Sequence, residues 1–179
     1  MKILIVYDSY FGNTEQVAKA IGDALRSHGS VEIRRVHDVA LEQLQEVDLV
    51  IVGSPTRAFR PSKAIGAFLD EIPPKGLEGV RVLAFDTRLH AAETSSRLFN
   101  VLSAVFGCAA CPIGEKLKRK GGKLLAPPEG FFVTDSEGPL KDDELERAAD
   151  WALRAVNALG LGNTGHYPHE ATGHIPLPR

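Results

Sequence analysis

The residues Ile3-Leu4-Ile5-Val6-Tyr7-Asp8-Ser9-Tyr10-Phe11-Gly12-Asn13-Thr14 carry the clearest structural signal in this chain. Ile3 to Val6 is a continuous apolar run with β-branched residues, which is typical of a strand buried on both faces. Ser9 to Thr14 is a turn of hydroxyl residues with one glycine and one asparagine. A helical pattern follows directly, because apolar residues recur at helix spacing at Val17, Ala18, Ile21 and Leu25. The sequence therefore predicts a buried strand, a short polar loop and a helix.

Such a loop is suited to binding an anion. The first turn of the following helix has backbone N–H groups without intrahelical partners, and the helix dipole places partial positive charge there. Ser9 and Thr14 add hydroxyl donors, Gly12 allows close backbone approach, and Asn13 can brace the loop. Ser9–Thr14 contains no Lys or Arg, so we expect neutral donors to hold the anion. The alternative is a plain strand-to-helix connection with an N-cap.

Composition limits the possible classes of protein. The 179 residues are 44% hydrophobic and 25% charged, which fits one compact domain. A net charge of −2 argues against a nucleic-acid-binding protein. No apolar run is long enough to span a bilayer. Met1-Lys2 leads directly into a strand and leaves no room for a signal peptide, and two cysteines do not make a disulfide framework, so we expect a cytoplasmic protein without a membrane partner.

Strand and helix patterns alternate along the chain. Further strands are expected at 31–36, 48–53 and 81–85, and an interrupted strand at 124–125 and 131–133; helices are expected at 13–28, 62–72 and 142–159, and a short helical or turn segment at 40–46. This alternation predicts a parallel sheet covered by helices on both faces. Ligands of such sheets bind beyond the carboxyl ends of the strands, where the loops Ser9–Thr14, Ser54–Arg60 and Asp86–Leu89 would meet.

Four segments, taken in order, resemble the flavodoxin family. They are the phosphate loop Ser9–Thr14, the flavin-contacting loop Val52-Gly53-Ser54-Pro55-Thr56, the start of a third loop in Ala84-Phe85-Asp86-Thr87-Arg88, and the fifth strand and turn in Pro128-Glu129-Gly130-Phe131-Phe132-Val133 with Glu137-Gly138-Pro139-Leu140. Together they span about residues 1–159. The resemblance implies a three-layer, doubly wound α/β domain with a five-stranded parallel sheet in the order 2-1-3-4-5, covering residues 1–160, followed by an irregular tail at 161–179.

The resemblance also implies FMN as the cofactor. In that interpretation the first loop would hold the 5′-phosphate through Ser9, Tyr10, Gly12, Asn13 and Thr14, with Phe11 in the same loop. The second loop would run along the isoalloxazine ring through Pro55, Thr56, Arg57, Ala58 and Phe59. The other side of the ring would be closed by Asp86, Thr87 and Arg88.

The function that the resemblance implies is electron transfer through bound FMN, with a redox partner protein or a small-molecule electron acceptor. Many flavodoxins have a hydroxyl residue in place of Phe11, and carrier flavodoxins are usually strongly acidic. An FMN-dependent NAD(P)H:quinone or nitro-compound oxidoreductase is therefore the alternative, and Arg57 could attract a nicotinamide cofactor's phosphate. A flavin-free interaction module is a third possibility. The sequence assigns no catalytic residue and allows a monomer or a homodimer.

Three other features have structural and functional interpretations. Cys108-Ala109-Ala110-Cys111 is a C-x-x-C at an expected helix start, which could be a redox pair or half of a metal site, but we favour structural thiols. His166, His169 and His174 lie in an irregular tail, which we expect to be solvated or docked on the surface rather than to bind a metal. Residues 93–106 are expected to form an inserted helix near the ligand.

Overall fold

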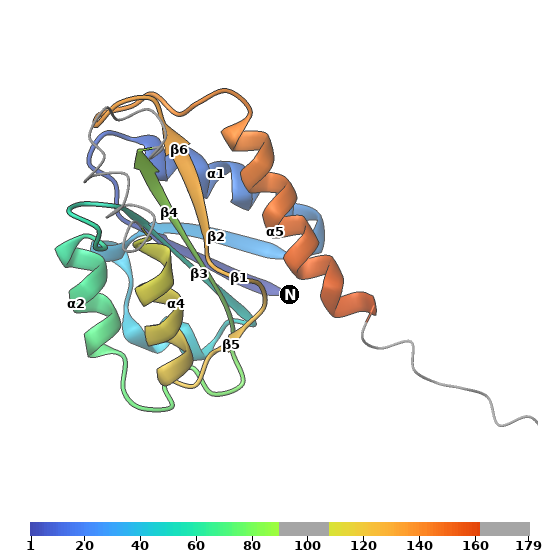
Figure 1. The fold of residues 1–179 in the computed structure, drawn as a ribbon. Coiled ribbons are helices and arrows are strands. Elements are labelled where there is room, and N and C mark those ends of the chain that lie inside the picture. The colour runs from blue at the N-terminus through green and yellow to red at the C-terminus, as the bar shows by residue number, and fades with distance from the viewer. Residues whose placement is uncertain (90–107, 162–179) are drawn as a thin grey trace, which may run out of the picture.

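Six strands, all paired in parallel, form the central sheet of the computed structural model, which describes residues 1–89 and 108–161 (Figure 1). The strand order is β2-β1-β3-β4-β5, and β6 also pairs with β4. This order confirms the predicted fold class. The strands are β1 (Lys2–Tyr7), β2 (Ser30–Arg35), β3 (Leu49–Pro55), β4 (Arg81–Leu89), β5 (Lys123–Leu124) and β6 (Glu129–Val133).

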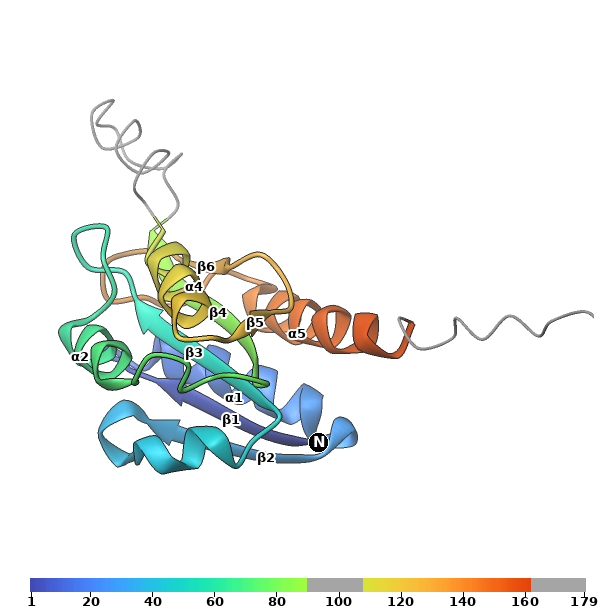
Figure 2. The ribbon, with the colours of Figure 1, turned by 90° about the horizontal axis from the view of Figure 1, so that it is seen from below.

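Helices cover both faces of the sheet, which gives the expected three layers. The α-helices are α1 (Asn13–Leu25), α2 (Lys63–Glu71), α4 (Ala110–Arg119) and α5 (Glu144–Leu161), and short 3-10 helices occupy Arg26–His28, Val36–Asp38 and Leu41–Gln45. Helices α1 and α5 lie together on one face, and α2 and α4 lie on the other (Figures 1 and 2).

The alternation of side chains along β1 explains its unbroken apolar sequence. Ile3 and Ile5 belong to the core under α1 and α5, whereas Leu4 and Val6 belong to the core under α2 and α4. All four are at most 2% exposed. A central strand of a sheet covered on both faces needs an apolar side chain at every position, because successive side chains point to opposite faces.

The predicted interrupted strand is confirmed as the two short strands β5 and β6. Both pair with β4, with Arg81 opposite Lys123 and Phe85 opposite Glu129. Pro127 and Pro128 lie between them. Proline has no N–H to donate to a ladder, so two strands with a break replace one continuous strand.

Strand β4 is longer than the sequence indicated. We expected it to end at residue 85 and to lead into a loop, but it continues to Leu89, so Asp86, Thr87 and Arg88 lie within the strand. The reason is that both neighbours also continue: Pro55 of β3 pairs with Thr87, and Phe132 of β6 pairs with Arg88. The backbone groups of these polar residues therefore have ladder partners.

The other element boundaries agree with the sequence to within a few residues. Helix α5 reaches Leu161, so the expected domain boundary at residue 160 falls in its last turn. The predicted inserted helix at 93–106 and the three tail histidines lie outside the described residues. Among the residues described, no helix is long and apolar enough to cross a membrane.

Candidate functional site

The loop after β1 is held in place by its own polar groups. The N–H of Gly12 donates to Oγ of Ser9 at 3.0 Å, and the N–H of Ser9 donates to Oδ1 of Asp8 at 2.9 Å. Gly12 is the N-cap of α1 and has φ of 87°, a backbone conformation that favours glycine. A Cβ at Gly12 would have no heavy atom within 4 Å. The loop thus leaves the N-terminus of α1 open to an anion.

Two side chains at the start of α1 fasten this loop to distant segments. The hydroxyl groups of Thr14 and Thr87 lie 2.8 Å apart in a buried hydrogen bond. The amide nitrogen of Asn13 donates to the carbonyl oxygen of Glu137 at 2.9 Å, in the turn after β6. Asn13 therefore braces the loop, as its residue type suggested. These contacts bring the first and third predicted segments together.

A cation approaches the first loop, which the sequence did not indicate. Arg35, the last residue of β2, donates from Nη2 to the carbonyl oxygen of Ser9 at 2.9 Å. The prediction that neutral donors would hold an anion at Ser9–Thr14 did not take this arginine into account. The register places Tyr7 of β1 opposite Arg35, so both strands end at the same edge of the sheet. The sequence did not predict this contact, because the register between two parallel strands cannot be read from the sequence of either strand alone.

The second loop begins with a buried serine and ends in a tight hairpin. Oγ of Ser54 accepts a hydrogen bond from the N–H of Ser62 at 2.8 Å, which ties the loop to the start of α2. Arg57 and Arg60 exchange backbone hydrogen bonds of 2.9 and 3.0 Å. Between them, Ala58 and Phe59 have φ of 47° and 63°, which is uncommon for residues with a side chain. Ala58 and Phe59 are the two central residues of a two-residue hairpin, and such hairpins favour positive φ at both central positions.

Two aromatic side chains of the first loop are exposed. Tyr10 is 53% exposed and Phe11 is 47% exposed. The guanidinium of Arg57 lies 5.2 Å from the centre of the Tyr10 ring, a cation–π contact that joins the first loop to the second. The exposed rings are therefore placed where a ligand or a partner that binds between the two loops could contact them.

The second loop is also joined to β4. The N–H of Thr56 donates to the carbonyl oxygen of Thr87 at 2.8 Å. Since the Thr87 hydroxyl contacts Thr14, one residue of β4 connects both loops. All three predicted segments therefore meet at the carboxyl edge of the sheet.

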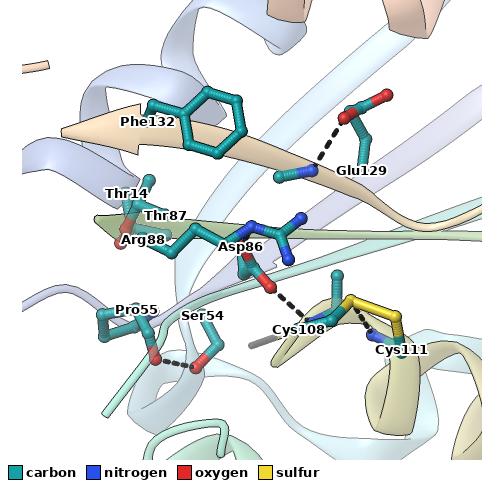
Figure 3. A network of polar contacts seen from close by, with 12 residues as sticks. Thr14, Ser54, Pro55, Asp86, Thr87, Arg88, Cys108, Cys111, Glu129 and Phe132 are labelled. Atoms are coloured by element: carbon teal, nitrogen blue, oxygen red, sulfur yellow. Dashed lines mark hydrogen bonds and ion pairs between the residues drawn. A yellow bond between two sulfur atoms is a disulfide. The ribbon is translucent and has the colours of Figure 1, made fainter. Parts of the chain in front are cut away.

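Asp86 has a different environment from the one its place in the sequence suggested. Its side chain is fully buried, and Oδ2 accepts a hydrogen bond from the N–H of Ala110 at 2.8 Å, at the start of α4 (Figure 3). Oδ1 lies 3.1 Å from Nε of Arg88, in an ion pair without the alignment of a good hydrogen bond. Arg88 is only 22% exposed and lies over the ring of Phe132.

Burial raises the pKa of the Asp86 carboxyl to about 6, while Arg88, the amides of Ala110 and Ala109, and the Thr56 hydroxyl act in the opposite direction. Desolvation prevails because the carboxylate has lost its water and its one cation is not ideally placed. Gly130 makes room for that cation, since a Cβ there would overlap the Arg88 guanidinium.

The C-x-x-C segment is a disulfide. Cys108 and Cys111 are bonded to each other immediately before and within the first turn of α4, so the interpretation as free structural thiols is wrong (Figure 3). Spacing alone could not decide this, because the same separation serves a bridge, a thiol pair or a metal site. Within the described ranges no group of three or more His, Cys, Asp or Glu residues could hold a metal ion.

Comparison with known proteins places the chain in a family. A family model described as flavodoxin matches residues 5–151. The chain belongs to the flavodoxin family. A flavodoxin of Clostridium saccharobutylicum is 36% identical over 162 residues, covering 89% of this chain and 98% of that protein. An NAD(P)H dehydrogenase (quinone) of Azorhizobium caulinodans is 28% identical, covering 82% of this chain and 90% of that protein.

Solved flavodoxin structures share the fold. A flavodoxin from the domain Archaea superposes with a TM-score of 0.68 at 24% identity, covering 89% of this chain and 99% of that one. Oxidised flavodoxin 1 of Bacillus cereus gives a TM-score of 0.69 at 20% identity, covering 88% of this chain and 98% of that one. As a flavodoxin-family protein, the chain binds FMN and acts in electron transfer with redox partner proteins. The open N-terminus of α1 and the exposed aromatic rings beside it fit such a group.

Proposed function

We propose that FMN binds at the carboxyl edge of the sheet, between the loop after β1, the loop after β3 and the end of β4. The observation that carries this assignment is the double connection of Thr87, which bonds to Thr14 through its hydroxyl and to Thr56 through its backbone. The proposed site comprises Ser9, Tyr10, Phe11, Gly12, Asn13, Thr14, Pro55, Thr56, Arg57, Ala58, Phe59, Asp86, Thr87 and Arg88.

In this proposal the first loop holds the phosphate. The free amides at the start of α1 and the Ser9 and Thr14 hydroxyls supply neutral donors, and Arg35 adds a positive charge behind the loop. A cation there offsets part of the phosphate charge, which an arrangement of neutral donors alone would leave unbalanced. Tyr10, Arg57 and Phe59 would lie beside the flavin ring and limit its contact with water.

FMN supplies the redox chemistry when bound, and the chain sets its environment and access. We propose that the protein is an electron carrier, reduced by a partner protein. Arg57 and the exposed Phe11 favour a second candidate, an NAD(P)H:quinone oxidoreductase, and the Azorhizobium relative bears that name. Rapid mixing of the FMN-loaded protein with NADPH and with NADH distinguishes the two. Direct loss of flavin absorbance on turnover timescales supports the enzyme, and reduction only when a reductase protein is added supports the carrier.

The site assignment has its own test. Combining Ser9→Ala with Thr14→Val should weaken FMN binding by about 2–4 kcal/mol, because phosphate oxygens lose two donors in a partly buried site. Quenching of flavin fluorescence on titration measures this, and circular dichroism checks that the variant is folded. Ser27→Ala, an exposed serine in the 3-10 helix after α1, is the matched control and should bind FMN normally. Unchanged affinity in the double variant would place the phosphate elsewhere.

We also propose a cytoplasmic location and either a monomeric or a homodimeric state. The exposed rings of Tyr10 and Phe11 would serve contact with a redox partner rather than a permanent interface, because the two side chains form only a small apolar patch. Sedimentation velocity with and without FMN determines the oligomeric state.

A further inference from the structure

The Cys108–Cys111 disulfide lies beside the proposed flavin site but is not part of it. It lies at the N-terminus of α4, next to Asp86 and the end of β4 (Figure 3). Cys111 is exposed and Cys108 is half-buried. A bridge that spans two intervening residues constrains the unfolded chain much less than a long-range one. A purely stabilising role therefore explains little of its presence.

The structure distinguishes the two sulfur atoms. The backbone N–H of Cys111 donates to Sγ of Cys108 at 3.0 Å. This amide belongs to the first turn of α4, which has ten residues, so Sγ of Cys108 also lies at the positive end of a helix dipole. Both effects stabilise a negative charge on Cys108 when the bridge opens. No comparable donor to Cys111 is present in the described residues.

A buried carboxylate lies beneath the same turn. Oδ2 of Asp86 accepts the N–H of Ala110, which lies between the two cysteines, at 2.8 Å. Asp86 is fully buried and is paired with Arg88. This arrangement fixes the turn that carries both sulfur atoms. It also places a second acid at the helix N-terminus, where it competes with a Cys108 thiolate for the same positive potential.

We propose that Cys108 and Cys111 are a redox-active pair that undergoes thiol–disulfide exchange with an external dithiol, with Cys111 as the sulfur attacked and Cys108 as the leaving group. Asp86 is a positioning residue that holds the turn. This inference shares Asp86 with the proposed flavin site, but its chemistry needs no electrons from FMN.

The exchange proceeds in two balanced steps. A thiolate of the dithiol attacks Sγ of Cys111, a mixed disulfide forms, and Cys108 leaves as a thiolate. The second thiolate of the donor then attacks the donor's other sulfur atom, which is bonded to Cys111 in the mixed disulfide. This releases Cys111 as a thiolate. The donor departs as a cyclic disulfide, the protein gains two electrons, and the two protons lost by the donor are available to the two cysteines. Exposure of Cys111 allows the first attack, and a stabilised Cys108 thiolate makes that attack faster.

The first experiment uses the full-length protein as purified. We expect a few millimolar dithiothreitol to reduce the bridge in the folded protein within minutes, and oxidised dithiothreitol to restore it, as measured by the mass added on alkylation. Circular dichroism after reduction should show that the fold persists. A bridge that resists reduction in the folded protein, but is reduced once guanidinium unfolds the chain, would overturn the proposal.

The second experiment compares the single-cysteine variants Cys111→Ser and Cys108→Ser after reduction. At pH 6.5 the remaining Cys108 should react with iodoacetamide about tenfold faster than the remaining Cys111, because its thiolate is stabilised. Exposure alone predicts the opposite order, since Cys111 is the more exposed residue. Equal rates, or faster reaction at Cys111, would contradict the assignment of the leaving group.

Asp86 is tested in the Cys111→Ser background. Asp86→Asn keeps an oxygen acceptor for the Ala110 amide but removes the competing charge, so the reaction of Cys108 at pH 6.5 should become several-fold faster. An unchanged or slower rate would contradict the proposed competition between the Asp86 carboxylate and the Cys108 thiolate. Asp86→Ala also removes the acceptor of the Ala110 N–H, so Cys108 should react more slowly in that variant than in Asp86→Asn, and equal rates in the two variants would overturn the positioning role. Asp70→Asn, which removes an exposed carboxylate paired with Lys116 from α2, is the control and should leave the rate unchanged.

Discussion

The hydroxyl oxygens of Thr14 and Thr87 lie 2.8 Å apart, and this buried hydrogen bond joins the first turn of α1 to β4 across 73 positions of the sequence. Thr14 is 1% exposed and Thr87 is 6% exposed, so neither hydroxyl has ready access to water in its place. When a buried hydroxyl loses its partner, the free energy of unfolding falls by more than the hydrogen bond itself contributes to it.

Thr14→Val and Thr87→Val should therefore each lower the free energy of unfolding by about 1–3 kcal/mol, because each leaves one buried hydroxyl unsatisfied. The double variant should cost less than the sum of the two, since valine replaces both hydroxyls with groups of similar shape. Urea unfolding of the three variants measures this coupling. Strictly additive changes in the free energy of unfolding would show that the two hydroxyls do not interact with each other in solution.

Two glycines with equally open surroundings should respond to alanine in opposite directions. Neither a Cβ at Gly12 nor one at Gly66 would have a heavy atom within 4 Å, but only Gly12 has positive φ. Gly12→Ala should lower the free energy of unfolding by about 1–2 kcal/mol, because alanine is strained in the left-handed region. Gly66→Ala, inside α2, should raise it by about 0.5–1 kcal/mol through helix propensity.

The same pair separates stability from ligand binding. Gly12 lies in the loop proposed to hold the phosphate, and Gly66 lies in the middle of α2. Gly12→Ala should therefore also weaken FMN binding, whereas Gly66→Ala should leave it unchanged, as measured by fluorescence titration. Normal affinity in the folded Gly12→Ala protein would argue against close backbone approach at this position.

The sequence predicted the parts of the fold that follow from local pattern. The apolar run from Ile3 to Val6 predicted a central strand, and the alternation of strands with helices predicted the layers and, through the family resemblance, the strand order. Pro127 and Pro128 indicated the break between β5 and β6 correctly. These features depend on residue type and spacing, which are visible in one chain.

The parts that the sequence did not predict depend on contacts between distant segments. Asp86 to Arg88 look like a loop because they are polar, but their pairing with β3 and β6 places them in a strand. Arg35 reaches Ser9 only because β1 and β2 end at the same level. Residue type alone could not show either relationship, nor the state of the Cys108–Cys111 pair.

The raised pKa of Asp86 predicts a specific dependence of stability on pH. The folded protein binds the proton more tightly than the unfolded chain, because the pKa of the Asp86 carboxyl is about 6 instead of its ordinary 3.8. The favourable contribution of this group is therefore complete below about pH 3.8 and is lost as the pH rises through about 6.

Asp86→Asn does not titrate, so its free energy of unfolding relative to wild type should rise by up to about 3 kcal/mol between pH 4 and pH 7. Removing the partner of Arg88 adds an offset that does not change with pH in this range. Urea unfolding at several pH values measures the slope.

Asp70→Asn is the control with the opposite sign, because its hydrogen bond and ion pair with Lys116 lower the pKa of Asp70. Relative to wild type, that variant should lose stability as the pH rises through the acidic range. A flat pH profile for the difference between Asp86→Asn and wild type would show that Asp86 titrates normally in the folded protein.

Gly130 determines whether Arg88 can remain beside Asp86. A Cβ at Gly130 would overlap the Arg88 guanidinium, so Gly130→Ala must displace this side chain from its position 3.1 Å from Oδ1 of Asp86. Without its cation, the buried carboxylate is less favourable, and the pKa of Asp86 should rise further above 6. Carbon-13 NMR titration of the carboxyl group measures this, with Gly66→Ala as the control that should leave it unchanged. An unaltered Asp86 pKa in Gly130→Ala would mean that Arg88 is not the cation that stabilises the charged form.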